Sequence, residues 1–254
     1  MSELPLIFDS AGQLLLVCLV LVIAETVYVT FGFGSGLIAV GGLAMVVPEV
    51  LDVVVVLLLI SLPCELFVVL QSRRQIVWKG VLLITIGVIA GIATGTMILR
   101  FAEPTFILIL LGAFLMVAGS AFLLIPARRS FDIPAWVGPP VGLVSGVLTG
   151  MFGTGGPPLI FYYQLGGVDK AIFRGNLMTI FLLMTLLRVP SYAVAGFITS
   201  ERLWSALVVM PAVILGIWLG NRIHLQLDEA TFRRMVSVAL VIIGGVLLVQ
   251  RILA

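Results

Sequence analysis

Three ionisable side chains stand inside strongly apolar stretches of the sequence, where charged residues are rare. Glu25 lies in VIAETVYVTF, Glu65 in LISLPCELF and Arg188 in LLMTLLRVPSY. An arginine in such a place can hold an oxyanion through two parallel hydrogen bonds, or it can neutralise a buried carboxylate. A carboxylate in a low dielectric can bind and release a proton. These residue types therefore indicate anion binding, with proton transfer as a second chemistry.

Each of these residues has a less functional interpretation as well. Arg188 is read as an anion ligand, as the partner of Glu65 in a structural ion pair, or as a side chain that extends to the membrane interface. Glu25 and Glu65 are candidates for proton coupling. For Glu25, a neutral acid that stabilises helix packing is an equal alternative. Three further polar residues are weaker candidates for lining a transport path: Asn176, Asn221 and Tyr163.

Two glycine-rich breaks interrupt the apolar sequence. The first is FGSG at 33–36 and the second is GMFGTGGPP at 150–158. An apolar segment of about 10 to 12 residues follows each break, and as a helix it reaches about 15–18 Å, half of a bilayer. We therefore expect two half-helices that begin near the membrane midplane. Ser35 and Thr154 are the expected N-caps, and Pro157 suits the first helical position.

The start of a helix offers unpaired N–H donors and about half a positive charge, so it favours a small anion. The alternative is that glycines allow helices to pack closely. Packing is favoured for glycines spaced by four elsewhere in the chain: Gly87, Gly91, Gly95, Gly216 and Gly220. For the two breaks a ligand site is favoured, and valine at Gly36 or Gly155 is expected to abolish transport without unfolding the protein. The expected substrate site comprises Gly34, Ser35, Gly36, Gly153, Thr154, Gly155, Gly156 and Arg188.

The elements that must position these groups are membrane helices. The chain of 254 residues is 61% hydrophobic and 10% charged, whereas a soluble domain carries about 25% charged residues. Apolar windows of about 20 residues, long enough to cross a bilayer, recur along the chain. VVVVLLLI at 53–60 is apolar on every face, unlike a strand of a membrane barrel. The predicted fold class is an all-α polytopic membrane protein, with helices over 11–31, 36–47, 51–70, 80–99, 104–125, 135–151, 157–166, 173–198, 202–221 and 232–250.

Ordered landmarks divide the chain into two homologous halves. FGSG at 33–36 is echoed by FGTG at 152–155, and GVIAGIATGTMI is echoed by AVILGIWLGNRI. We expect one membrane domain made of two repeats, 1–130 and 131–254. Each half has an odd number of segments and the basic loops change places between the halves, so the repeats are expected to be inverted, with both termini outside. The loop cations behind this expectation are Arg73, Arg74, Lys79, Arg128 and Arg129, then Lys170, Arg174, Arg222, Arg233 and Arg234.

Other classes of function find little support in the sequence. The N-terminus lacks the basic region of a signal peptide, so the first helix is expected to be retained. Cys18 and Cys64 read as small hydrophobic residues rather than as a disulfide or a metal site, and no cofactor is expected. No G-x-x-x-x-G-K-[ST] loop is present, so ATP is not expected to drive the protein directly. His224 is the single histidine and lies in a predicted loop, which disfavours an intramembrane enzyme.

FGFGSGLIAVGG and GMFGTGGPPLIFYY, in a chain of two homologous halves, resemble the sulfite exporter TauE/SafE family of bacterial membrane proteins. The resemblance covers nearly the whole chain. It implies a multi-pass protein of the cytoplasmic (inner) membrane that transports sulfite or organosulfur anions such as sulfoacetate, often outward. We therefore expect a secondary transporter, an exporter, that works by alternating access around a midplane site formed by both breaks. A passive anion channel is the alternative.

The expected partners follow from this interpretation. They are a small inorganic or organosulfur anion, the lipid bilayer, protons as a coupling ion and a second copy of the chain in a homodimer. The formal net charge of +2 gives no indication of nucleic-acid binding.

Overall fold

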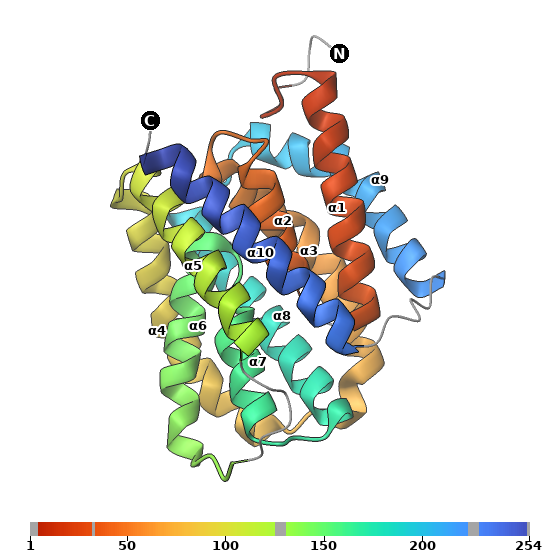
Figure 1. The fold of residues 1–254 in the computed structure, drawn as a ribbon, viewed down its shortest axis with the longest axis vertical. Helices are drawn as coiled ribbons and strands as arrows, with labels where there is room; N and C mark the ends of the chain where they lie inside the picture. Colours follow the sequence, from red (N-terminus) through yellow and green to blue (C-terminus); the bar gives the residue numbers. More distant parts are fainter. Residues whose placement is uncertain (1–4, 32–33, 125–130, 223–228, 253–254) are drawn as a thin grey trace. The chain divides into compact units, whose positions relative to one another are not determined.

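The computed structural model describes residues 5–31, 34–124, 131–222 and 229–252 (Figure 1). The described chain is helical and contains no strand in these ranges. Its helices are α1 (Ala11–Phe31), α2 (Ser35–Ala44), α3 (Val50–Ser72), α4 (Trp78–Phe101), α5 (Pro104–Leu124), α6 (Gly138–Phe152), α7 (Gly156–Leu165), α8 (Lys170–Val194), α9 (Ser200–Arg222) and α10 (Glu229–Ile252). Two short 3-10 turns, η1 (Arg73–Gln75) and η2 (Ala135–Val137), precede α4 and α6.

The helices follow the sequence prediction closely, and each lies within a few residues of its predicted range. The two predicted half-helices are confirmed, because α2 and α7 have 10 residues each. Among the described residues, 6 helices are long and apolar enough to cross a membrane. Pro63 and Pro190 lie inside α3 and α8, which continue beyond them.

Some residues named from the sequence lie outside the described part of the chain. These are Phe33, Arg128, Arg129 and His224, and the side chains of Cys64, Lys170 and Arg233 are likewise not described.

The helices form two compact units, and each takes helices from both predicted halves. Unit 1 comprises Met1–Ile60, Ala102–Ile125 and Ile198–Ala254. In it α1 packs along α9 and against α2, while α10 packs along α5 (Figure 1). Leu21 and Leu111 are among its fully buried side chains.

Unit 2 comprises Ser61–Phe101 and Pro126–Phe197. It contains the second part of α3, together with α4, α6, α7 and α8. The long contact between α4 and α6 organises this unit, with α8 packed against α4 and α7 packed against α6 (Figure 1). Phe152, Leu159 and Tyr192 are among the side chains that fill its interior.

Glycines allow α4 and α6 to approach each other closely, as predicted. A Cβ atom at Gly91 would overlap the carbonyl oxygen of Leu143 and would lie 2.8 Å from the Cα of Gly146. A Cβ atom at Gly95 would overlap the carbonyl oxygen of Val147. Any side chain at these positions would push the two backbones apart, so the packing interpretation of these glycines is confirmed.

The pair α1–α9 of unit 1 repeats this arrangement. A Cβ atom at Gly216 would lie 2.8 Å from both the carbonyl oxygen of Val22 and the Cβ of Glu25, and one at Gly220 would lie 2.9 Å from the carbonyl oxygen of Thr26. Thr26 also donates a hydrogen bond from its hydroxyl to the carbonyl oxygen of Gly216, 3.2 Å away. In both units, therefore, the fourth helix of one half packs on the first helix of the other half.

Candidate anion site at the second glycine break

The second break lies in unit 2, between α6 and α7. Gly153 ends α6 in the left-handed region with φ 72°, and its N–H donates to the carbonyl oxygen of Thr149 at 2.8 Å. Glycine suits this backbone conformation because a Cβ atom would be strained there. Gly155 is the N-cap of α7, which begins at Gly156. The chain thus stops one helix and starts another within three residues, as the sequence predicted.

The predicted N-cap at this break is wrong. Thr154 is buried but precedes the N-cap residue, and no side chain caps α7. Gly155 takes the N-cap position because it packs against α6. A Cβ atom there would overlap the carbonyl oxygen of Ser145 and the hydroxyl of Thr149. Pro157 is the second helical residue rather than the first.

Arg188 of α8 lies at the end of α6, beside this break. Its side chain is 2% exposed, and its Nη1 donates to the carbonyl oxygen of Thr149 at 3.3 Å. This carbonyl also accepts the hydrogen bond from Gly153, so a cation and the first residue of the break share one acceptor. The negative end of the α6 dipole favours a cation at this place. The Nε of Arg188 has no hydrogen-bond partner in the described part of the chain.

Glu65 completes the charged part of the site. It lies in the second part of α3, within unit 2, and it is 8% exposed. The pairing of Glu65 with Arg188 stays a prediction. A buried arginine needs such compensation, because an isolated ionised group inside a membrane protein is costly.

Tyr192 is a member of this site that sequence reasoning missed. It is fully buried, its hydroxyl donates to the carbonyl oxygen of Gly150 at 2.8 Å, and the guanidinium of Arg188 lies 5.4 Å from its ring centre. The sequence could have identified Tyr192 as a neighbour of Arg188, because it follows Arg188 by four residues and so lies on the same face of α8.

The first break, in unit 1, also contains a left-handed glycine, but here it directly precedes the second helix. Gly34 is left-handed with φ 95°, α2 begins directly after it at Ser35, and the N–H of Ile38 donates to the carbonyl oxygen of Gly34 at 3.1 Å. Ser35 is therefore the first helical residue and the expected N-cap is wrong, since Gly34 holds that position without a side-chain hydrogen bond. Gly36 lies in the first turn of α2 and is half-buried. That both helix starts meet at one anion stays a prediction.

A sequence model of the family described as sulfite exporter TauE/SafE matches residues 17–247. The chain belongs to the sulfite exporter TauE/SafE family. A probable sulfite/organosulfonate exporter TauE of Cupriavidus necator is 31% identical over 232 residues, which cover 88% of this chain and 89% of that protein. A probable inner membrane transporter protein TsaS of Comamonas testosteroni is 26% identical over 191 residues, 74% of this chain and 79% of the relative. No solved structure matches this chain.

Membership of the TauE/SafE family, together with the apolar helices, makes this chain a multi-pass transport protein of the inner membrane. The candidate site must therefore work in a low-dielectric setting. In that setting an unpaired backbone group or charge costs far more than in water.

The remaining polar candidates have local structural roles. Oδ1 of Asn176 accepts a hydrogen bond from the N–H of Val77 at 2.7 Å, which ties α8 to the start of α4. Tyr163 is buried, and its ring meets those of Tyr162 and Phe173 edge to face. Asn221 is exposed at the end of α9. None of these observations places the three candidates on a transport path.

Glu25 lies within the α1–α9 contact of unit 1 and is 5% exposed. Its Cβ occupies the space that Gly216 leaves free. This position agrees with the prediction of an ionisable residue buried among apolar helices, and its proton coupling stays a prediction.

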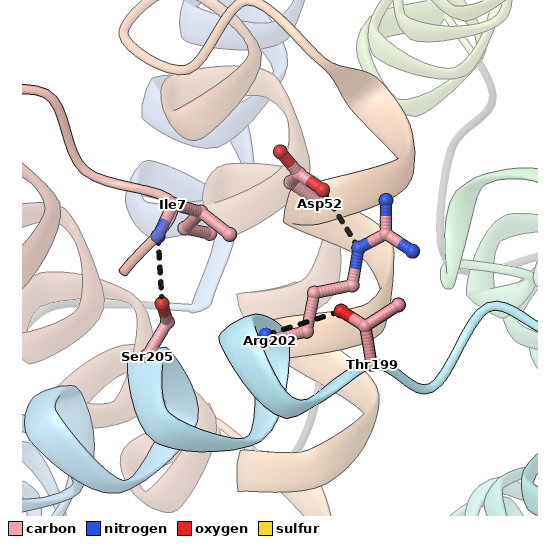
Figure 2. A network of polar contacts seen from close by, with 5 residues as sticks. All are labelled: Ile7, Asp52, Thr199, Arg202 and Ser205. Atoms are coloured by element: carbon pink, nitrogen blue, oxygen red, sulfur yellow. Dashed lines mark hydrogen bonds and ion pairs between the residues drawn. The ribbon is translucent and has the colours of Figure 1, made fainter. Parts of the chain in front are cut away.

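A second polar network holds α3 and α9 of unit 1 together (Figure 2). Nε of Arg202 donates to Oδ1 of Asp52 at 2.7 Å, and the backbone N–H of Arg202 donates to the hydroxyl of Thr199 at 3.4 Å. The N–H of Ile7 donates to the buried hydroxyl of Ser205 at 3.0 Å. Asp52 and Arg202 lie in the first turns of α3 and α9.

Proposed function

We propose that this chain is a secondary transporter that exports small sulfur-containing anions, such as sulfite or sulfoacetate, across the inner membrane. The family supports transport, and the relative from Cupriavidus necator is named as an exporter of sulfite and organosulfonates. The family also supports the expectation that the chain is not an enzyme.

The observation that carries the proposal for an anion is the position of Arg188. Its guanidinium is buried at a glycine break in a membrane protein, and it retains a donor without a hydrogen-bond partner in the described residues. Arginine stays charged at neutral pH and presents its N–H groups in a planar fork that matches an oxyanion. Glu65 and the carbonyl end of α6 balance this charge in the absence of a substrate. A sulfite or sulfonate group would take over part of that balance.

The transport cycle that we propose is alternating access without ATP. The substrate meets the N–H groups of Gly155 and Gly156 together with Arg188. Protons are the proposed coupling ion, with Glu25 and Glu65 as their carriers. A pH gradient imposed across proteoliposomes should then accelerate anion flux in one direction, whereas an uncoupled carrier would respond only to the anion gradient.

A passive anion channel remains the alternative function. A carrier must change conformation for each substrate, so its flux saturates with substrate concentration. Anion on one side of the membrane also accelerates the transport of labelled anion from the other side. A channel passes anions at rates that far exceed such turnover, and it shows no exchange stimulation. Counterflow of labelled sulfite against unlabelled sulfite in proteoliposomes separates the two.

The test of the substrate class is a transport panel with sulfite, sulfate, thiosulfate, sulfoacetate and taurine. Arg188→Gln should weaken transport of the preferred anion about thirtyfold, the size expected for losing a hydrogen bond to a charged group. Arg222→Gln is the matched control, because Arg222 is exposed and its guanidinium lies 5.0 Å from the ring centre of Trp218. The double variant Arg188→Gln with Glu65→Gln removes both charges, so it tests binding without leaving one buried charge uncompensated. Normal flux in a folded double variant would contradict the proposed site.

A further inference from the structure

Arg188 and Tyr192 together hold the last turn of α6. Arg188 donates to the carbonyl oxygen of Thr149 and Tyr192 donates to that of Gly150, so one face of α8 binds two consecutive carbonyls. The carbonyl oxygen of Thr149 also accepts the N–H of Gly153, whereas the carbonyls at the end of a helix generally lack a donor within the helix. In a membrane such carbonyls must find other donors. The two side chains of α8 supply these donors directly before the break at Gly153.

Tyr192 is itself held firmly by its surroundings. It is fully buried, and its ring meets that of Phe197 edge to face with the ring centres 5.3 Å apart. The neighbouring Ser191 donates from its hydroxyl to that of Thr96 at 2.9 Å, which fixes this turn of α8 against α4. The tyrosine is therefore a fixed support rather than a side chain that can follow the guanidinium.

We infer that Tyr192 is a positioning residue, which keeps the guanidinium of Arg188 beside the second glycine break and fixes the end of α6 that forms this break. The inference rests on the proposed anion site. The hydroxyl and the ring have separate tasks. The hydroxyl anchors the α6 carbonyl end, and the face of the ring supports the planar cation, an arrangement that the ring quadrupole favours.

This division of tasks makes two variants informative. Tyr192→Phe removes the hydrogen bond to Gly150 and keeps the ring next to Arg188. Tyr192→Leu removes both. If Tyr192 positions the arginine, the KM for the transported anion should rise about fivefold in Tyr192→Phe, the size expected for one hydrogen bond. In Tyr192→Leu it should rise about thirtyfold, since the support of the cation is lost as well.

The maximal transport rate separates positioning from a general structural role. We expect it to stay within about twofold of the parent rate in Tyr192→Phe, because the hydrogen bond acts on binding geometry. Tyr162→Phe is the matched control, since Tyr162 lies in α7, is half-exposed and is not in contact with Arg188 in any described hydrogen bond or ring contact. A KM that stays unchanged in Tyr192→Phe and in folded Tyr192→Leu would overturn the inference.

A measurement without substrate keeps this test independent of the proposed function. In protein with isotope-labelled arginine, the guanidinium resonance of Arg188, assigned with Arg188→Lys, should carry a ring-current shift from Tyr192. We expect this shift to persist in Tyr192→Phe and to vanish in Tyr192→Leu, and an unchanged resonance in Tyr192→Leu would overturn the inference. If the parent protein transports none of the anions, the proposed function fails while this measurement still tests the positioning of Arg188.

Discussion

Gly216 of α9 faces Glu25 of α1 so closely that a Cβ atom on the glycine would lie 2.8 Å from the Cβ of the glutamate. In the corresponding contact of unit 2, Gly91 faces Gly146. The α1–α9 contact thus accommodates a buried carboxylic acid where the α4–α6 contact has a second glycine. The α1–α9 pair therefore holds an ionisable group, and the glycine opposite makes room for it.

Gly91→Ala should destabilise the protein more than Gly216→Ala. The added methyl at Gly91 would overlap a backbone carbonyl, whereas at Gly216 the nearest atoms would lie 2.8 Å away. Overpacking of this kind costs about 1–3 kcal/mol. Thermal unfolding in detergent checks the order. Gly245→Ala is the matched control on α10, because nothing lies within 4 Å of a Cβ atom there. Equal unfolding temperatures for the Gly91 and Gly245 variants would contradict the close α4–α6 contact.

The sequence was sufficient to predict the helices and both breaks, because glycine, proline and apolar length act locally. It was not sufficient for the N-caps. Ser35 and Thr154 match the statistical preference for helix starts, yet Gly34 and Gly155 take those positions. Gly34 takes the N-cap position of α2 because the backbone there is left-handed, and Gly155 takes that of α7 because it packs closely against α6. Residue preferences alone predict neither.

The site could be predicted only in part, because the partners of its residues depend on tertiary contacts. Arg188 was identifiable as a buried cation, because arginine in an apolar stretch is costly. Its acceptor on α6 and its support by Tyr192 depend on how α8 packs within unit 2, and a tyrosine in an apolar helix gives no sign of the carbonyl that it will bind.

Gly155→Val should impair folding rather than transport alone. The sequence predicted an inactive but folded protein, but a Cβ atom at this position would overlap a carbonyl of α6. We expect poor recovery of monodisperse protein in detergent and a lower unfolding temperature. Gly156→Ala should be milder, since the nearest atom to its Cβ would be the ring edge of Phe181 at 3.3 Å. A Gly155→Val protein as stable as the parent would restore the original expectation.

The ion pair of Asp52 with Arg202 should make a modest contribution to stability. Its side chains are 17% and 16% exposed, so water still screens the two charges in part. Pairs of this kind are worth about 0–1 kcal/mol. A double-mutant cycle with Asp52→Asn and Arg202→Gln should give a coupling energy in this range that shrinks at high salt. A coupling energy that does not change with salt would mean that geometry, not charge, holds α3 to α9.

Glu65→Gln should increase the apparent affinity for the transported anion. In the proposed site Glu65 and the anion both offer negative charge to Arg188, and glutamine keeps the shape of the side chain while removing its charge. The KM should therefore fall, and the maximal rate should fall with it, because the site no longer has a carboxylate that displaces the anion. The measurement is transport of a sulfonate whose charge is constant near neutral pH, with Glu49→Gln, an exposed acid before α3, as the control. A KM that rises in Glu65→Gln would show that the carboxylate holds Arg188 in its binding position instead of competing with the anion.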